Sequence, residues 1–324
     1  MTQYLDFEKP IKLIEEQIDQ LSANAESSGA AAMSVQLTKL KQNAERLLVE
    51  IYSKLDPWQK TQVARHQERP HFKDYVAALV TDFVELSGDR KFAEDAAIVG
   101  GLGRFLGRPC VIMGHEKGRT TTERLKHNFG MARPEGYRKA IRLMDMADRF
   151  NLPVVSLVDT AGAYPGLGAE ERGGAEAIAR STERCLSLGA PMVSVIVGEG
   201  GSGGAIAIAA ANTVLMLEHA VYSVISPESG ASILFRDAAR AKDVALAMKI
   251  TAQSCLEFNV IDGIIKEPVG GAHRAPEQAI AAVGAAVAKA IDALDGMDGD
   301  ALRRQRRARF LAIGRMAETG APAR

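Results

Sequence analysis

The sequence predicts an α/β fold with buried strands, preceded by a helical hairpin. A unit of short apolar strand, glycine-rich turn and helix recurs three times between Pro153 and Gly230. This succession is typical of α/β proteins whose strands are covered by helices. Residues 1 to about 56 contain no such unit and instead carry apolar residues at helical spacing.

Two amphipathic helices are predicted within residues 1–56. Their apolar stripes consist of Ile11, Ile14, Ile18 and Leu21, and of Leu37, Leu40, Leu47 and Ile51. Small and polar residues from Ala23 to Ser34 separate the stripes and indicate the connection of a hairpin. Because little nearby sequence can cover both stripes, we expect this segment to serve subunit assembly as well as packing.

The segment after the hairpin contains three further predicted elements. A helix is expected from about Lys73 to Leu86. Two strands, 98–103 and 109–114, flank a Leu106-Gly107-Arg108 turn and predict a β-hairpin. Pro134 then begins a helix, as proline does at the first helical position.

The recurring unit defines the main domain, residues 57–296. Its predicted strands and turns are 153–158 followed by 159–166, 192–197 followed by 198–204, and 213–217 with 221–225 followed by 226–230. Ser226 is expected to cap the helix that Pro227 begins.

The C-terminal region is predicted to be helical from about Pro276, and residues 297–324 to form a basic helix or tail. It carries the arginines Arg303, Arg304, Arg306, Arg307 and Arg309. We interpret this run as a solvated helix face rather than an RNA-binding patch.

Composition excludes several functional classes. Lys+Arg and Asp+Glu number 40 each among 324 residues, so no overall charge attracts nucleic acid or anionic membranes. No stretch approaches the ~20 apolar residues of a membrane span, and the N-terminus does not resemble a signal peptide. Cys110, Cys185 and Cys255 form neither a disulfide framework nor a metal motif, and the histidines form no HExxH zinc motif. A cytoplasmic protein without its own metal is expected.

The glycine-rich segment from Gly198 to Gly204 is the strongest functional signal. It contains five glycines in seven residues at a predicted strand-to-helix junction. The first N–H groups of a helix lack intrahelical partners, and glycine lets a ligand approach them without a Cβ in the way. Close packing of helix on strand is the alternative explanation. The density of glycine favours a ligand-facing turn that stabilises an anion.

A second interpretation of the same segment is an NAD-binding fold. Gly198, Gly200 and Gly203 satisfy GxGxxG after a strand, and Glu218 follows at the distance expected for a ribose-binding acid. Against it, the helix predicted from Gly203 to about Ala211 is short and the unit lies in the middle of the chain.

Other candidate segments are less specific. Gly162 to Gly166 indicates a second ligand-facing loop, although a simple β-turn explains it too. Lys249, within Ala247-Met248-Lys249-Ile250, resembles a biotinylated lysine but is expected inside a helix. A basic group with one aromatic residue fits either a phosphate or carboxylate site or a solvated loop: Lys117, Arg119, Arg124, Lys126 and Phe129.

Together these segments resemble the alpha subunits of acetyl-coenzyme A carboxylase carboxyltransferase, over essentially the whole chain. The matching segments are Leu5-Asp6-Phe7-Glu8, Ala97-Ile98-Val99-Gly100-Gly101, Asn128-Phe129-Gly130-Met131, Pro134 to Ala140, Gly162 to Gly166, Gly168 to Gly173, Gly198 to Ala205, Tyr222 to Glu228 and Gly270 to Arg274. One departure is Ala161, where the family usually has proline.

The resemblance implies a crotonase-like fold, a spiral of strand-strand-helix units, and transfer of a carboxyl group from carboxybiotin on a carrier protein to acetyl-CoA, giving malonyl-CoA for fatty-acid synthesis. It implies a zinc-carrying beta subunit in an α2β2 assembly, and biotin carboxylase in the larger complex. A non-catalytic scaffold is the remaining alternative.

The resemblance also assigns the site. It implies that the N–H groups of Gly203 and Gly204 stabilise the biotin enolate, so that no side chain has to act as nucleophile. The remaining residues predicted to line the site are Gly200, Gly201, Gly162, Ala163, Tyr164 and Gly166.

Overall fold

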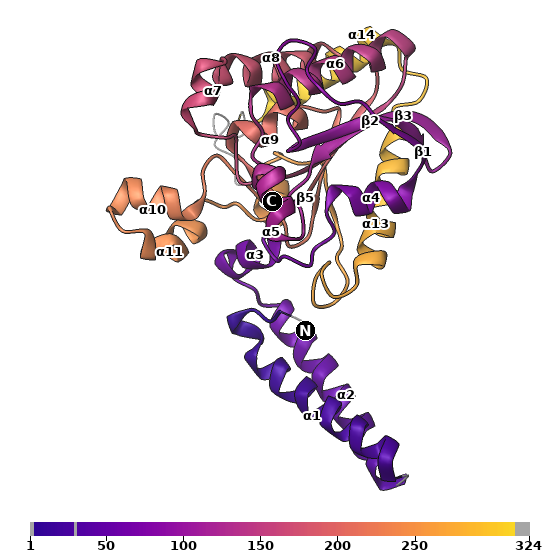
Figure 1. Cartoon of the computed structure of the whole chain (residues 1–324), viewed down its shortest axis with the longest axis vertical. Coiled ribbons are helices and arrows are strands. Elements are labelled where there is room, and N and C mark those ends of the chain that lie inside the picture. Colours follow the sequence, from indigo (N-terminus) through magenta and orange to yellow (C-terminus); the bar gives the residue numbers. More distant parts are fainter. Residues whose placement is uncertain (1–2, 29–30, 315–324) are drawn as a thin grey trace.

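The computed structural model describes residues 3–28 and 31–314, and within them eight strands form one sheet (Figure 1). The strand order is β1-β2-β3-β4-β5-β6-β8, and β7 pairs with β5. The strands are β1 Val80–Glu85, β2 Ile98–Phe105, β3 Arg108–His115, β4 Val154–Thr160, β5 Met192–Gly201, β6 Thr213–Leu217, β7 Val221–Ser223 and β8 Gly263–Ile265.

The sheet has an antiparallel part and a parallel part. The predicted β-hairpin is present as β2 and β3, which pair antiparallel from Ile98 opposite His115 to Phe105 opposite Arg108. From β3 onward the neighbours in the strand order are parallel. Every residue of β4 and β5 is buried, as expected for central strands covered by helices on both faces.

Helices lie on both sides of this sheet (Figure 1). On one side α6 contacts β2 and β3, and α9 contacts β4 and β5, whereas α4 and α13 contact each other on the other side. The helices of the main body are α3 Pro57–Ala64, α4 Phe72–Leu79, α5 Thr121–Lys126, α6 Pro134–Phe150, α7 Leu167–Glu171, α8 Gly174–Ser187, α9 Ser202–Ala209, α10 Pro227–Phe235, α11 Ala241–Ala247, α12 Ala252–Glu257, α13 Pro276–Asp292 and α14 Gly299–Ala312.

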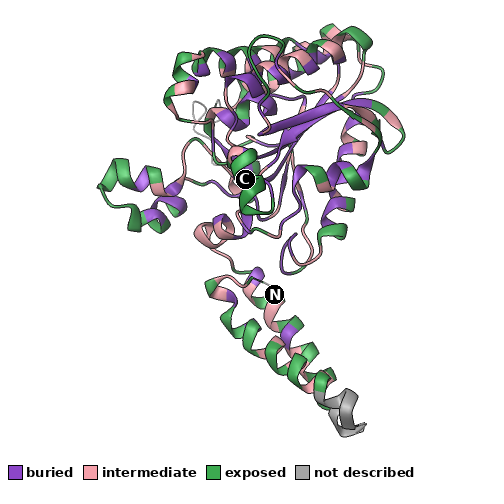
Figure 2. Cartoon of the chain, in the orientation of Figure 1, coloured by how far each residue is buried: buried purple, intermediate pink, exposed green. Residues whose placement is uncertain are grey.

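The predicted N-terminal hairpin is confirmed as α1 Lys9–Ser28 and α2 Ala31–Tyr52, which pack on each other and project from the body (Figures 1 and 2). The expected linker from Ala23 to Ser34 is wrong in extent. It is helical up to Ser28 and again from Ala31, and residues 29–30 lie outside the described residues.

A cluster of polar contacts attaches this hairpin to the body. Arg274 binds the buried carboxylate of Glu8 at 3.1 Å and Glu15 at 2.9 Å. The Tyr52 hydroxyl donates to Glu8 at 3.0 Å, and its ring contacts His219 edge-on. These contacts lie at the base of the hairpin, and the described part of α1 and α2 beyond it projects away from the body (Figure 1).

The helix predicted from Lys73 to Leu86 is wrong in its second half. The helix α4 ends at Leu79, and residues Val80–Glu85 form β1 against β2. Four of these six residues, Val80, Thr81, Phe83 and Val84, are β-branched or aromatic and favour a strand. The register shifts between Thr81 and Val84, where Asp82 has a φ of 53°.

Of two smaller predictions, one is wrong and one is confirmed. Lys249 does not lie in a helix, because α11 ends at Ala247 and Lys249 has a φ of 54°. Ser226, in contrast, caps α10 as predicted: its side chain accepts from the Ser229 N–H, and Pro227 is the first helical residue.

The arginine run is not uniformly solvated. Arg306 is completely buried beneath α8, where Nη1 donates to the carbonyls of Cys185 and Leu188 at 2.6 and 2.8 Å. Nη2 donates to the carbonyl of Ala190 at 3.0 Å and to Oδ1 of Asn212. Burial lowers the pKa of this guanidinium to about 10. Arg306 thus supplies donors to the carbonyl groups at the C-terminal end of α8.

Candidate functional site

Two loops that follow neighbouring parallel strands meet backbone to backbone. A Cβ added to Gly201 would lie 2.1 Å from the carbonyl oxygen of Ala161, and one added to Gly204 would lie 2.6 Å from the carbonyl carbon of Gly162. Gly162 itself has a φ of 153°. The close-packing explanation therefore accounts for Gly201 and Gly204 as glycines, because any side chain there would collide with main-chain atoms.

The first turn of α9 is arranged differently. Its N-cap residue, Gly201, has no side chain to accept from the N–H groups that follow. Ser202 has a φ of 54°, a costly conformation for serine. Gly203 is half-buried, and a Cβ there would meet only the side chain of Ile178, at 3.2 Å and beyond. The N-terminus of α9 thus offers N–H groups and the positive end of the helix dipole to a ligand.

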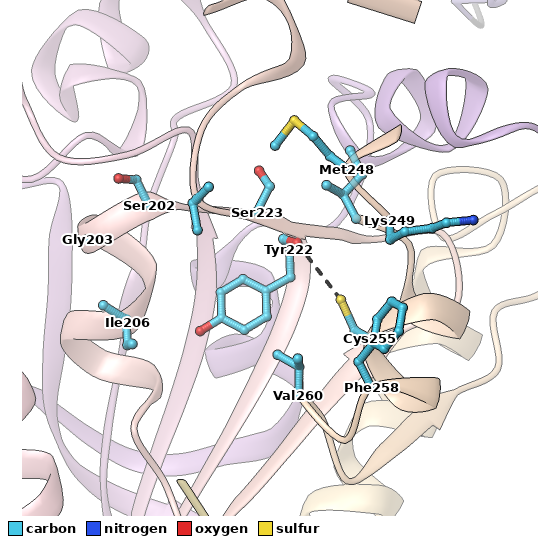
Figure 3. Close-up of a pocket in the computed structure, with 12 residues that line it drawn as sticks. Ser202, Gly203, Ile206, Tyr222, Ser223, Met248, Lys249, Cys255, Phe258 and Val260 are labelled. Carbon is cyan, nitrogen blue, oxygen red and sulfur yellow. Dashed lines mark hydrogen bonds between the residues drawn. The ribbon is translucent and has the colours of Figure 1, made fainter. Parts of the chain in front are cut away.

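An apolar cavity of about 660 Å³ adjoins this turn (Figure 3). Ser202 and Gly203 form its edge towards α9. The Lys249 side chain extends away from Gly203 in the same view. Most of the remaining lining is apolar or aromatic: Ile206, Tyr222, Val224, Met248, Ile250, Phe258 and Val260.

The two titratable groups that face this cavity are held neutral. Burial raises the pKa of Tyr222 to about 12 and that of the Cys255 thiol to about 12. The Cys255 thiol lies 3.9 Å from the carbonyl oxygen of Tyr222. Neither group is ionised near neutral pH, so neither is suited to act as a nucleophile or a general base.

A second, polar cavity of about 280 Å³ lies on the other side of the glycine-rich turn. Its two carboxylates are both paired. The Asp159 carboxylate binds Lys117 Nζ at 2.6 Å and accepts the Glu199 N–H at 2.9 Å. The Glu199 carboxylate binds Arg65 Nη2 at 2.6 Å. Of the basic residues noted in the sequence, Lys117 and Arg124 line this cavity together with Phe129.

His115 lies close to the same turn, at the end of β3. It is 1% exposed and interacts with the main chain of Gly204 and with the charges of Asp159 and Lys117. Burial lowers its pKa to about 4, so the imidazole is neutral at pH 7. The two carboxylates beside the turn are thus each bound to a basic side chain, and the nearby imidazole is neutral.

The structure brings together most of the predicted site residues. Gly200, Gly201, Gly203 and Gly204 lie at the junction of β5 and α9, and Gly162 and Ala163 contact Gly204. Ala161, the departure from the usual proline, is exposed at this junction.

Tyr164 and Gly166 lie further along the same loop. The N–H of Tyr164 donates to the Ala132 carbonyl, and Arg133 stacks over the Tyr164 ring at 5.0 Å. Gly166 packs against that ring: a Cβ there would lie 2.3 Å from it. Neither residue lines either of the two cavities beside the turn.

The lining of the apolar cavity was not predicted from the sequence. Tyr222 lies in β7, Phe258 is the C-cap residue of α12 and Met248 follows α11, and none carries a signal that separates it from a core residue. Glu199 did carry a signal, because a carboxylate inside a glycine-rich segment next to a buried strand requires a partner. That partner, Arg65, lies 134 residues earlier in the chain.

The dinucleotide-binding interpretation is wrong. Gly198 and Gly200 lie inside β5 rather than in a turn after it. The Glu218 carboxylate already binds Lys266 Nζ at 2.7 Å and accepts the Glu267 N–H. It is therefore not available as the ribose-binding acid of such a site.

In residues 3–28 and 31–314, no group of three or more histidine, cysteine, aspartate or glutamate side chains has a metal-binding arrangement. No helix in this part of the chain has the length and apolar character needed to span a membrane.

Several solved structures share this fold. Transcarboxylase 12S superposes with a TM-score of 0.57 at 19% identity, covering 72% of this chain and 44% of its own. The beta subunit of geranyl-CoA carboxylase from P. aeruginosa gives 0.54 at 15% identity, covering 78% and 46%. The chain spans less than half the length of these structures. The fold is thus the crotonase-like fold of the carboxyltransferases.

Sequence comparison places the chain more narrowly. Residues 4–314 match the family described as acetyl co-enzyme A carboxylase carboxyltransferase-like. The chain is 64% identical over 312 residues to the acetyl-coenzyme A carboxylase carboxyl transferase subunit alpha of Caulobacter vibrioides, covering 96% of this chain and 98% of that one. The Methylobacterium nodulans subunit alpha is 62% identical over 315 residues, covering 97% and 99%. The chain belongs to the family of acetyl-CoA carboxylase carboxyltransferase alpha subunits.

Proposed function

We propose that the first turn of α9 binds the ureido oxygen of carboxybiotin, with the N–H groups of Gly203 and Gly204 as donors. Carboxybiotin is a substrate here, delivered by a separate carrier protein. One observation carries the proposal: an N-terminus without a side-chain cap opens onto an apolar cavity large enough for a bicyclic ring. The bicyclic ring and the aliphatic chain of biotin would lie against the apolar lining, and the ureido oxygen would lie at the N-terminus of α9.

This arrangement suits carboxyl transfer without a catalytic side chain. When the carboxyl group leaves biotin, negative charge develops on the ureido oxygen, and two N–H groups at the positive end of a helix stabilise it. The released ring nitrogen can take the proton from the methyl group of acetyl-CoA, so no protein base is required. The neutral Tyr222 and Cys255 agree with such a site.

The second anion of the reaction, on acetyl-CoA, requires a second set of donors. We place it in a beta subunit that forms an α2β2 assembly with this chain and carries any zinc. The biotin carboxyl carrier protein and biotin carboxylase complete the complex. We place the assembly in the cytoplasm, where the three free cysteines remain reduced.

The isolated chain is expected to produce no malonyl-CoA, and mixing it with the beta subunit is expected to restore production. The reason is that one chain supplies one glycine-rich turn where two anions form. Product formation from acetyl-CoA and carboxylated carrier, measured for each subunit and for the mixture, provides the test. Full activity of this chain alone would refute the divided site, and an inactive but correctly assembled complex would favour a scaffold.

We further propose that the N-terminal hairpin serves assembly. Deleting residues 1–56 is expected to reduce complex formation while circular dichroism of the body stays close to that of the full chain. Because Arg274 would lose Glu8 and Glu15, a modest loss of stability is expected as well. The test is to measure the size of the complex formed when the truncated chain is mixed with the beta subunit. A truncated chain that assembles fully would show that the hairpin is dispensable.

A further inference from the structure

Arg65 connects the glycine-rich turn to a separate part of the molecule. It follows α3, and its guanidinium donates to Glu199 from Nε at 3.1 Å and from Nη2 at 2.6 Å. The same guanidinium donates to Glu228 from Nη1 at 2.5 Å and from Nη2 at 3.3 Å. One side chain therefore joins three elements that lie far apart in the sequence.

Glu228 belongs to a projecting segment, residues 226–248, that we call the outer arm (Figure 1). The arm contains α10 and α11, which contact each other extensively, and α11 also contacts α3. Val224, two residues before the arm, and Met248, its last residue, line the apolar cavity. Both ends of the arm are thus attached at the lining of this cavity, so a shift of the arm would change the shape of the cavity.

Glu199 presents an electrostatic problem that Arg65 resolves. Its side chain is 6% exposed, and it lies four residues before Gly203 in the turn proposed to stabilise an anion. An unpaired carboxylate in this low-dielectric surrounding would oppose negative charge developing nearby. Burial works against the charge of Arg65, but hydrogen bonds to Glu199 and Glu228 raise its pKa, so it stays ionised.

We propose that Arg65 is a positioning residue with two effects: it neutralises Glu199 beneath the turn, and through Glu228 it holds the outer arm where the apolar cavity accepts the biotin ring. This inference rests on the proposed function of the turn. It predicts that the two halves of the Arg65 interaction act on different kinetic constants, which a purely structural ion pair would not do.

The test uses the reconstituted complex and measures kcat, KM for carboxylated carrier, KM for acetyl-CoA and thermal stability. Arg65→Gln is expected to lower kcat about tenfold or more, because the Glu199 charge is left uncompensated. The double variant Arg65→Gln/Glu199→Gln removes both charges and is expected to recover most of kcat. Glu228→Gln is expected to raise KM for carboxylated carrier about threefold or more, with little effect on KM for acetyl-CoA.

A matched control is Arg180→Gln. Arg180 also binds two glutamates, Glu176 and Glu183, at 3.0 Å each, but on the exposed surface. The kinetic constants of the complex with Arg180→Gln should match those of the unmodified complex. Arg65→Gln with normal kcat, or a double variant no better than the single one, would overturn the inference. If Arg65→Gln fails to assemble, the double variant and Glu228→Gln still test the two effects.

The same data separate this inference from the proposed function. If Gly203→Val is inactive while Arg65→Gln is fully active, the positioning role alone is wrong. If Gly203→Val is fully active, the anion does not form at this turn, and both fail.

Discussion

Gly203→Val is expected to lower kcat of the reconstituted complex by about 10²–10³-fold while the fold stays intact, because one donor to the developing anion is obstructed. A Cβ added at Gly203 would meet only the flexible side chain of Ile178, and the residue lies at the edge of the apolar cavity. Gly204→Val is not an equivalent test, since its side chain would collide with the main chain of Gly162. Steady-state kinetics together with circular dichroism measure both parts of the prediction.

Ser202→Ala provides the comparison for this variant. Ser202 also lines the cavity, but its hydroxyl has no assigned chemical role, so the loss of kcat should be far smaller. Glu199→Gln is less suitable as a neutral comparison, because it leaves Arg65 with one carboxylate. An inactive Ser202→Ala beside an active Gly203→Val would contradict the anion-binding turn and favour a serine nucleophile.

Arg306→Met is expected to destabilise the body by at least about 3 kcal/mol, since several buried acceptors lose their donor at once. Methionine retains much of the volume, so the loss reports mainly on the hydrogen bonds to the end of α8 and to Asn212. The free energy of unfolding from urea titration is the measurement.

Arg307→Met is the matched control on the next residue of α14. Arg307 is exposed, and its substitution should change the free energy of unfolding by no more than about 0.5 kcal/mol. Equal stability of the two variants would show that the carbonyl groups find other donors when Arg306 is absent.

The elements predicted correctly from sequence are those whose local pattern agrees with their environment. The strand β5 is apolar and fully buried, and the helix α6 begins at Pro134 with its apolar side inward. The prediction for β1 was wrong although most of its residues favour a strand, because the segment was interpreted as a continuation of α4. The boundary at Leu79 depends on the pairing of β1 with β2, whose residues lie about twenty positions further along.

The site was predictable in part. Glycine density located the turn, because a turn with close main-chain contacts needs glycine, but it did not separate Gly203, which faces the cavity, from Gly204, which packs against Gly162. That distinction depends on which atoms from other parts of the folded chain lie next to the Cα of each glycine. The position of Arg306 inside the body was unpredictable for a similar reason: its acceptors lie 94 to 121 residues away, and its neighbours in α14 are exposed.

The contacts of Arg306 can form only late in the synthesis of this chain. The carbonyl groups of Cys185 and Leu188 emerge from the ribosome well over a hundred residues before their donor. Until α14 has been synthesised, the end of α8 must rely on water, and the surface that Leu302 later covers stays open. A nascent or truncated chain that stops before α14 therefore exposes apolar surface of the kind that chaperones and proteases recognise. Packing of α14 against the body thus covers this surface only after most of the main domain has been synthesised.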